Sequence, residues 1–302
     1  MTKATRLATA TALLALTCSR TPPPDPAWVA EVEAWRARRL ASLTRPDGWL
    51  TLVGLHWLEV GRNRVGSAVD AEVFLEEAHV PAHVATLELT PDGQVLLDPV
   101  PGSGLLVNGE PAEPGPLTTD RGDSPSLLSL GPLRMVVIQR QDRFALRVRN
   151  PDSPLRANFA GLEYFPLDPR MRLPARLEPF DEPREVTVPV AQGPPQRFLA
   201  PGVVRFSLYG RDLSLLPLIS SPDDPTFFFV FRDATSGRQT YGGGRFLDAA
   251  APPPGSLELT LDFNFAYTPP CAFTPHATCP LPPPENVLPV PIRAGEKGYA
   301  KH

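Results

Sequence analysis

The chain has 302 residues, of which 40 are proline and 22 glycine, together about a fifth of the sequence and below the roughly 25–30 % at which an aperiodic chain becomes low-complexity. Hydrophobic residues make up 42 % and charged residues 21 %, which is enough apolar material for a folded core. The formal net charge of −4 excludes a nucleic-acid partner held by bulk positive charge, and we expect none. Because proline is excluded from helix interiors, the composition predicts a mainly β protein.

The first eighteen residues have the pattern of an export signal. Lys3 and Arg6 precede an apolar stretch at 7–17, which is too short to span a membrane and ends at Cys18. This arrangement resembles a bacterial lipoprotein signal, in which the cysteine is acylated and becomes the mature N-terminus. We therefore predict a signal peptide over 1–18, lipidation of Cys18, a proline-rich tether over 19–26, and a location in the periplasm or cell envelope. Secretion with cleavage nearby is the alternative.

The segment 27–58 is predicted to be a packing element made of one helix and one strand. Asp25 can cap a helix that has Pro26 at its first position. The turn sequence at 45–48 ends this helix, and the apolar run at 49–58 indicates a strand buried on both faces. The helix has an apolar stripe formed by Trp28, Val32, Trp35, Leu40 and Leu43. The four tryptophans, at 28, 35, 49 and 57, favour packing of this element onto the rest of the chain, with a tryptophan-lined ligand site as the alternative.

Residues 59–152 are predicted to form a β-sandwich of short strands joined by tight turns, of which Asn108-Gly109 is the clearest hairpin signal. The layout of Gly61-Arg62, His83, Asn108-Gly109 and Leu130-Gly131 resembles forkhead-associated β-sandwiches. The resemblance implies the architecture and not phosphothreonine binding, because Val80 occupies the place of an expected serine. The predicted strands are 72–76, 84–90, 94–98, 104–107, 126–130, 133–140 and 143–149.

Residues 153–302 are predicted to form a second β domain, a barrel or sandwich with a long proline-rich C-terminal loop. The predicted strands are 186–190, 203–209, 213–218, 227–231 and 257–261. Nine prolines follow between 269 and 291, in a stretch that also contains Cys271 and Cys279. If Cys18 carries lipid, an even pair of cysteines remains, and export predicts that this pair forms a disulfide.

Three polar segments in this half are candidates for chemistry, because irregular segments rich in polar residues are not explained by core packing. The glycine run at 242–244 would let the chain approach an anion, with Tyr241 and Arg245 binding it and Asn264 and Asn286 beside them. Asp262 and Glu285 would be a general acid and base. The structural alternatives are a glycine turn between strands, an Asp262 cap on its own turn, and loop amides that satisfy buried backbone groups.

A metal site is a further alternative. Cys271, His276 and Cys279 could be three ligands, with Asp262, Glu285 or His56 as the fourth. The sequence lacks a second cysteine pair and the familiar zinc and hydrolase motifs, so we expect no metal and no other cofactor.

Over most of its length after the signal, the chain resembles an uncharacterised bacterial family, the domain of unknown function 1684. The matching segments include FRDATSGRQTYGGGRFL at 231–247 and LDFNFAYTPPCAFTPHATCPLPPPENVLPVPI at 261–292. His276 stands where an aromatic residue is usual in that family. The resemblance implies no activity, and whether the protein is an enzyme stays open. Two hypotheses remain: an exported, lipid-anchored protein with a polar pocket for a small anionic ligand in the C-terminal domain, and a non-enzymatic structural or interaction lipoprotein that uses the sandwich as its docking surface.

Overall fold

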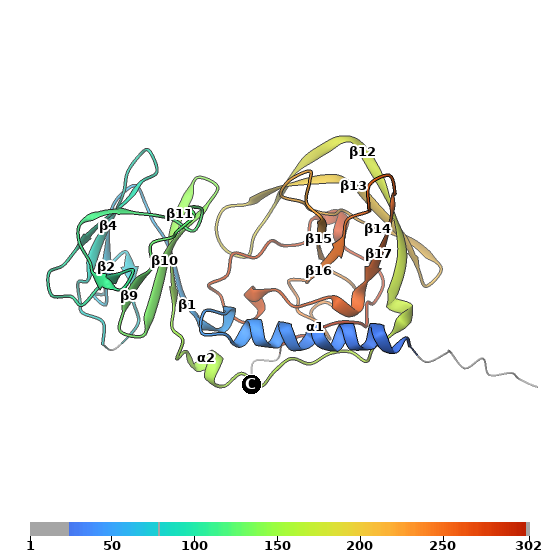
Figure 1. Ribbon diagram of the computed structural model, residues 1–302, viewed down its shortest axis with the longest axis horizontal. Helices are drawn as coiled ribbons and strands as arrows, with labels where there is room; N and C mark the ends of the chain where they lie inside the picture. The colour runs from blue at the N-terminus through green and yellow to red at the C-terminus, as the bar shows by residue number, and fades with distance from the viewer. Residues whose placement is uncertain (1–23, 78, 300–302) are drawn as a thin grey trace, which may run out of the picture.

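The computed structural model describes residues 24–77 and 79–299. The predicted signal peptide and Cys18 lie outside these residues. The described chain is mainly β, with one long N-terminal helix and several sheets, as the sequence predicts (Figure 1). None of the helices in the described ranges is long and apolar enough to cross a membrane.

The helix α1 spans Pro26–Thr44 and has the predicted cap, since the Asp25 side chain accepts a hydrogen bond from the Ala27 amide. It buries Trp28, Val32 and Leu43. Although α1 comes first in the chain, it lies along the C-terminal half of the molecule and not against the sandwich that follows it in sequence (Figure 1). The helix therefore brings N-terminal side chains to the C-terminal domain.

The N-terminal half is a β-sandwich. One sheet has the order β1-β11-β10-β9-β6-β7 and the other the order β3-β2-β4-β5-β8. Alternate residues of both sheets fill one core, for example Leu87 and Leu97 from one sheet and Val137 and Leu146 from the other. The strands are β1 (Leu52–Trp57), β2 (Gly61–Gly66), β3 (Val73–Phe74), β4 (Ala85–Leu89), β5 (Val95–Pro99), β6 (Leu106–Val107), β7 (Glu110–Pro111), β8 (Gly115–Leu117), β9 (Leu128–Leu130), β10 (Leu133–Arg140) and β11 (Arg143–Arg149).

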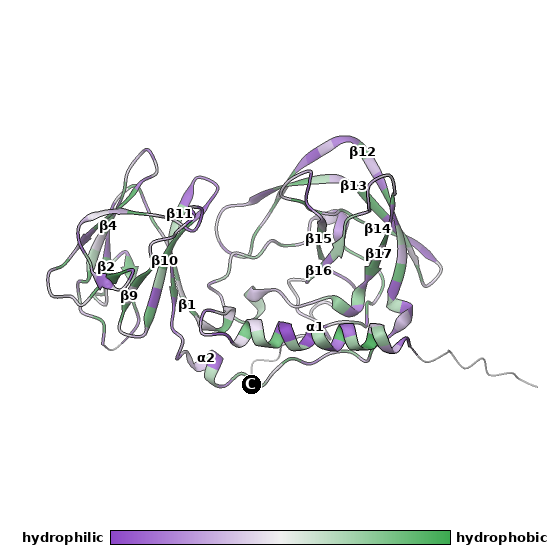
Figure 2. Ribbon diagram, in the orientation of Figure 1, coloured by the Kyte–Doolittle hydropathy of each residue, from purple (hydrophilic) through white to green (hydrophobic). Residues whose placement is uncertain are grey.

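The C-terminal half has a four-stranded sheet of order β14-β13-β12-β17 and a hairpin, β15-β16, which share a second core. In the part of the chain that the structure describes, these sheets do not close into a barrel. Figure 2 shows hydrophilic residues along the outer part of β12, where most side chains are exposed to solvent. The strands are β12 (Arg172–Val188), β13 (Gln196–Leu208), β14 (Arg211–Leu215), β15 (Thr226–Phe231), β16 (Arg245–Ala250) and β17 (Glu258–Asp262).

The predicted strand at 49–58 is a 3-10 turn, η1 (Trp49–Thr51), followed by β1, which pairs with β11. The structure therefore places β1 in the sandwich, while α1 packs on the other half. A short helix, α2 (Pro154–Ala157), follows the sandwich.

The proline-rich segment is irregular but largely buried, with Phe273, Val290 and Ile292 each no more than 4 % exposed. It contains the 3-10 turns η4 (Pro270–Ala272) and η5 (Pro284–Asn286). The turn η3 (Phe263–Phe265) precedes this segment, and η2 (Pro169–Met171) precedes β12. The segment is therefore part of the C-terminal core.

Candidate functional site

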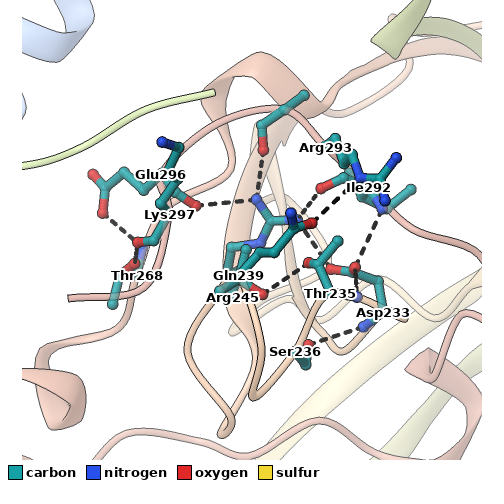
Figure 3. Close-up of polar contacts among 12 residues, drawn as sticks. Asp233, Thr235, Ser236, Gln239, Arg245, Thr268, Ile292, Arg293, Glu296 and Lys297 are labelled. Atoms are coloured by element: carbon teal, nitrogen blue, oxygen red, sulfur yellow. Dashed lines mark hydrogen bonds and ion pairs between the residues drawn. The ribbon is translucent and has the colours of Figure 1, made fainter. Parts of the chain in front are cut away.

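Arg245, the central residue of the predicted anion site, is fully enclosed. It is the first residue of β16, and its exposed fraction is 0 %. Its guanidinium donates to three backbone carbonyls within 292–296 and to the carboxylate of Asp233, 2.9 Å away (Figure 3). These donors fasten the C-terminal segment to the sheet, so the prediction that Arg245 binds an anion from solvent does not fit its geometry.

The side-chain amides of Asn264 and Asn286, which were predicted to lie beside the anion, also form hydrogen bonds with backbone groups. The Asn264 side chain donates to the carbonyl of Asp168 and accepts from its amide, both at 3.0 Å. The Asn286 side chain exchanges two bonds with the backbone of Leu216 and donates a third to the carbonyl of Val230. Both amides are completely buried. They satisfy backbone groups that irregular segments leave unpaired, which is the structural alternative given above.

The predicted acid and base, Asp262 and Glu285, have different environments. One oxygen of Asp262 caps η3 by accepting from the Asn264 amide, and the other accepts from the indole of Trp28 at 2.7 Å. Arg172 lies 4.0 Å from the same carboxylate. Glu285 is exposed in η5, and no described residue donates a hydrogen bond to it. The structure gives these two carboxylates no shared site.

Tyr241, Cys271 and Cys279 do lie together. The Tyr241 hydroxyl donates to the Cys271 carbonyl at 3.4 Å, and burial raises the pKa of Tyr241 to about 12. The predicted disulfide is not formed, because both cysteines are free thiols in the structure. Their side chains instead interact as a hydrogen-bonded pair, which lowers the pKa of the Cys271 thiol and raises the pKa of the Cys279 thiol. The Cys271 amide also donates to the Cys279 sulfur at 3.1 Å.

The metal alternative also lacks support in the geometry. Within residues 24–77 and 79–299, no group of three or more His, Cys, Asp or Glu side chains is placed to hold a metal ion. His276 instead lines a cavity with His56 between the two halves of the molecule. Burial lowers the pKa of both imidazoles, and for His56 the nearby His276 adds to the effect.

A cleft between α1 and the C-terminal domain has the features of a ligand site. Its volume is about 450 Å³, within the roughly 300–1,000 Å³ of small-molecule sites, which concentrate at such junctions. Five rings from distant parts of the chain form its walls. The lining residues are Trp35, Trp49, Phe228, Phe246, Tyr267, Arg38, Arg39, Asp248 and Pro270, and we call this the aromatic cleft.

A carboxyl and a phenol form the polar part of the aromatic cleft. The Tyr267 hydroxyl donates to Asp248 at 2.9 Å. Asp248 is open to solvent at the cleft, yet the surrounding atoms partly desolvate it and raise the pKa of its carboxyl, against the lowering effect of the Tyr267 hydrogen bond. Burial raises the pKa of Tyr267 as well, and the neighbouring carboxylate adds to this. Such a carboxyl can accept a hydrogen bond from a ligand or exchange a proton with it.

The two arginines of the cleft differ in how they are held. Arg39 forms an ion pair with the buried Glu296 at 2.9 Å and donates to the Thr268 carbonyl at 2.6 Å. Its guanidinium lies over the ring of Tyr267, 4.9 Å from the centroid. Arg38 is exposed and has no hydrogen bond or ion pair with any described residue. Arg38 is therefore the cation available to a ligand.

A smaller cavity of about 340 Å³ adjoins the aromatic cleft and shares Trp35, Asp248 and Tyr267 with it. Asp262 lines this second cavity beside Trp28. Of the six ligand or catalytic candidates taken from the sequence, Asp262 is therefore the one that lines a cavity next to the aromatic cleft. The tryptophan-lined ligand site, given above as an alternative, corresponds in part to this cleft, because Trp35 and Trp49 form two of its walls.

The comparisons with known proteins place the C-terminal half in a family. A family model described as "Protein of unknown function (DUF1684)" matches residues 157–297. The chain belongs to this family. The matched segment supplies Phe228, Phe246 and Tyr267 to the cleft, whereas α1 and its Trp35 lie before that segment.

One solved relative is the uncharacterized protein from gene locus rrnAC0354 of Haloarcula marismortui, determined by solution NMR. It is 35 % identical, and the similarity covers 51 % of this chain and 85 % of that chain with a TM-score of 0.43. No match was found among curated proteins.

Proposed function

We propose that this chain is an exported, lipid-anchored protein that binds a small organic anion with a flat apolar body in the aromatic cleft. The observation that carries the proposal is the combination of five ring side chains, an unpaired arginine and an Asp248–Tyr267 pair around one cavity. Most small-molecule sites have this composition, with apolar and aromatic walls and a few polar groups that fix the orientation of the ligand.

The chemistry of the walls defines the ligand class. Trp35 packs edge-on against Phe265, 5.4 Å between centroids, so its indole is held in place before a ligand arrives. A flat ligand would pack between Trp35 and Phe228 and remove apolar surface from water. An anionic group on the ligand would bind Arg38, and a donor at the other end would bind the Asp248 carboxyl. Whether the bound molecule is then transformed is left open.

The probe that fits this description is 4-aminobenzoate, which has a flat ring, a carboxylate and an amine. Titration followed by tryptophan fluorescence should give saturable binding that is tighter than that of benzoate or aniline. Trp35→Ala and Arg38→Gln should each weaken binding at least about tenfold, because each removes one wall or one charge-assisted bond. Arg238→Gln is the matched control, since Arg238 is exposed and does not line the cleft.

Equal binding of all three probes, or equal losses in Arg38→Gln and Arg238→Gln, would contradict the proposed orientation. Absence of binding by every flat anion would favour the second hypothesis, an interaction lipoprotein. The burial of Arg245, Asn264 and Asn286 supports the part of that hypothesis in which these residues stabilise the fold.

Export and lipid anchoring are supported by the sequence at 1–18 and have their own test. Expressed with its leader, the wild-type protein should incorporate labelled palmitate and sediment with membranes. Cys18→Ser should lose the label. Labelling of Cys18→Ser equal to that of the wild type would contradict lipidation at this residue.

A further inference from the structure

A separate cavity, of about 580 Å³, lies on the outer face of β10 and β11 in the N-terminal sandwich. Val136 and Ile138 are part of its apolar wall. Three arginines and two carboxylates, Asp47 and Asp120, bring charge into it. We call it the arginine cavity, defined by Arg134, Arg147, Arg149, Val136, Ile138 and Asp120.

Arg147 is buried in this cavity without a partner. On β11, Leu146 and Val148 point into the sandwich core, so Arg147 points to the opposite face. Its exposed fraction is 8 %. The Nε and Nη2 atoms of Arg147 are enclosed and have no hydrogen-bond partner among the described residues. Its guanidinium carbon lies 5.6 Å from the centroid of the Trp49 ring.

The other arginines of the cavity are held by backbone carbonyls. Arg149 donates to the carbonyls of Asp47 and Gly48. Arg134 donates to the carbonyls of Gly131 and Leu133, both at 2.8 Å. These bonds use donors but neutralise no charge, and the Arg149 cation adds to the positive field around Arg147.

The carboxylates near the cavity are already paired. Asp120 binds Arg140 at 2.8 Å and accepts from the Gln139 amide. Asp47 is paired with Arg45. Burial, together with Arg140 and Arg149, lowers the pKa of Arg147 to about 10, so the side chain is still a cation at neutral pH.

A buried cation with unsatisfied donors is costly, and removing such a side chain from water is compensated only by a counter-charge or by hydrogen-bond acceptors. The planar guanidinium fork matches the two oxygens of a carboxylate or phosphate. We propose that the arginine cavity is a binding site for an oxyanion, a carboxylate or a phosphate monoester, attached to a compact apolar group. The oxyanion pairs with Arg147, and the apolar group packs on Val136 and Ile138. The proposal uses none of the charged groups of the aromatic cleft, although the two sites meet at Trp49, which lines the cleft and lies beside the Arg147 guanidinium.

The probes are hexanoate, hexyl phosphate, inorganic phosphate and 1-hexanol, titrated into the wild-type protein by calorimetry. We expect hexanoate or hexyl phosphate to bind at least about tenfold more tightly than 1-hexanol, because the alcohol lacks the charge-assisted bond. The stronger of the two identifies the head group. Inorganic phosphate should bind more weakly than hexyl phosphate. Equal affinity for 1-hexanol and for both anions would overturn the proposal.

Arg147→Met should lose anion binding by at least about tenfold and remain folded, because it removes an unpaired buried charge. Arg143→Met is the matched control, since Arg143 lies on the same strand and the same face but outside the cavity. Trp35→Ala separates this site from the aromatic cleft and should leave hexanoate binding unchanged. If Arg147→Met does not fold, Arg147→Lys and the guanidinium NMR signal of wild-type Arg147 supply the test. That signal should shift with hexanoate and not with 1-hexanol. Hexanoate binding that is unchanged in Arg147→Met or in Arg147→Lys would overturn the proposal.

Discussion

Replacing Arg245 by methionine distinguishes a structural arginine from a ligand-binding one. Methionine keeps much of the length and apolar volume of the side chain but has no charge and no donors. In the wild type, the guanidinium neutralises Asp233 and binds three carbonyls within 292–296. The variant would leave Asp233, which is 7 % exposed, as a buried carboxylate without its cation.

The expected loss of unfolding free energy is about 3–5 kcal/mol, the cost of removing one partner of a buried ion pair. At about 2–4 °C per kcal/mol, the midpoint of thermal unfolding should fall by about 6–20 °C. The double variant Arg245→Met/Asp233→Asn should recover part of this loss, because it removes the unpaired charge. Glu285→Gln, at an exposed residue, should change the midpoint by less than about 2 °C.

The assay is thermal unfolding followed by circular dichroism, with the 4-aminobenzoate titration on each folded variant. If Arg245→Met unfolds within about 2 °C of the wild type but loses probe binding, Arg245 is a ligand residue and the structural argument is refuted. A fall in stability with unchanged binding below the transition supports the argument.

Three further predictions follow from single contacts. Trp28→Phe removes the 2.7 Å bond to Asp262 and should lower the unfolding free energy by about 1–2 kcal/mol, measured by urea denaturation; no change would show that the bond contributes nothing. The raised pKa of Asp248 means that the folded state holds this proton more tightly, so stability should fall as pH rises from the ordinary aspartate value through the raised one. Asp248→Asn should flatten that part of the melting profile, and an unaltered profile would contradict the shift. The lowered pKa of Cys271 predicts that iodoacetamide modifies Cys271 before Cys279, which peptide mass spectrometry would detect or refute.

The fold could be predicted from the sequence wherever local signals were complete. Asp25, Pro26 and the apolar stripe define α1, and two short apolar runs separated by Gln141-Asp142 define β10 and β11, whose bounds match the prediction. The long strand β12 was missed over most of its length. It contains Pro174, Pro179 and Pro183, and Pro179 lies at an irregularity in its pairing with β13. Prolines are tolerated at such irregularities, so they do not exclude a strand there.

The site could not be predicted because its partners are far apart in sequence. The strand β16 was also missed, and with it the alternation that places Phe246 and Asp248 on one face and Arg245 on the other. Treating 245–250 as a strand would have grouped Arg245 with the core residue Leu247. No local pattern, however, indicates that α1 crosses the C-terminal domain and brings Trp35 beside Tyr267.

Buried polar residues hold the walls of the aromatic cleft in place, and they include Asp262 and Arg245, two of the candidates taken from the sequence. Asp262 holds α1 through Trp28, and Glu296 holds it through Arg39, eleven residues further along the helix. Glu296 also accepts from the Thr268 amide, next to Tyr267 in the chain. Arg245 binds the carbonyl of the same Glu296, so both buried ion pairs converge on one C-terminal segment. A dense set of buried polar contacts is needed here because the cleft is assembled from a helix, the β15-β16 hairpin and loops, which no single continuous sheet holds at fixed positions.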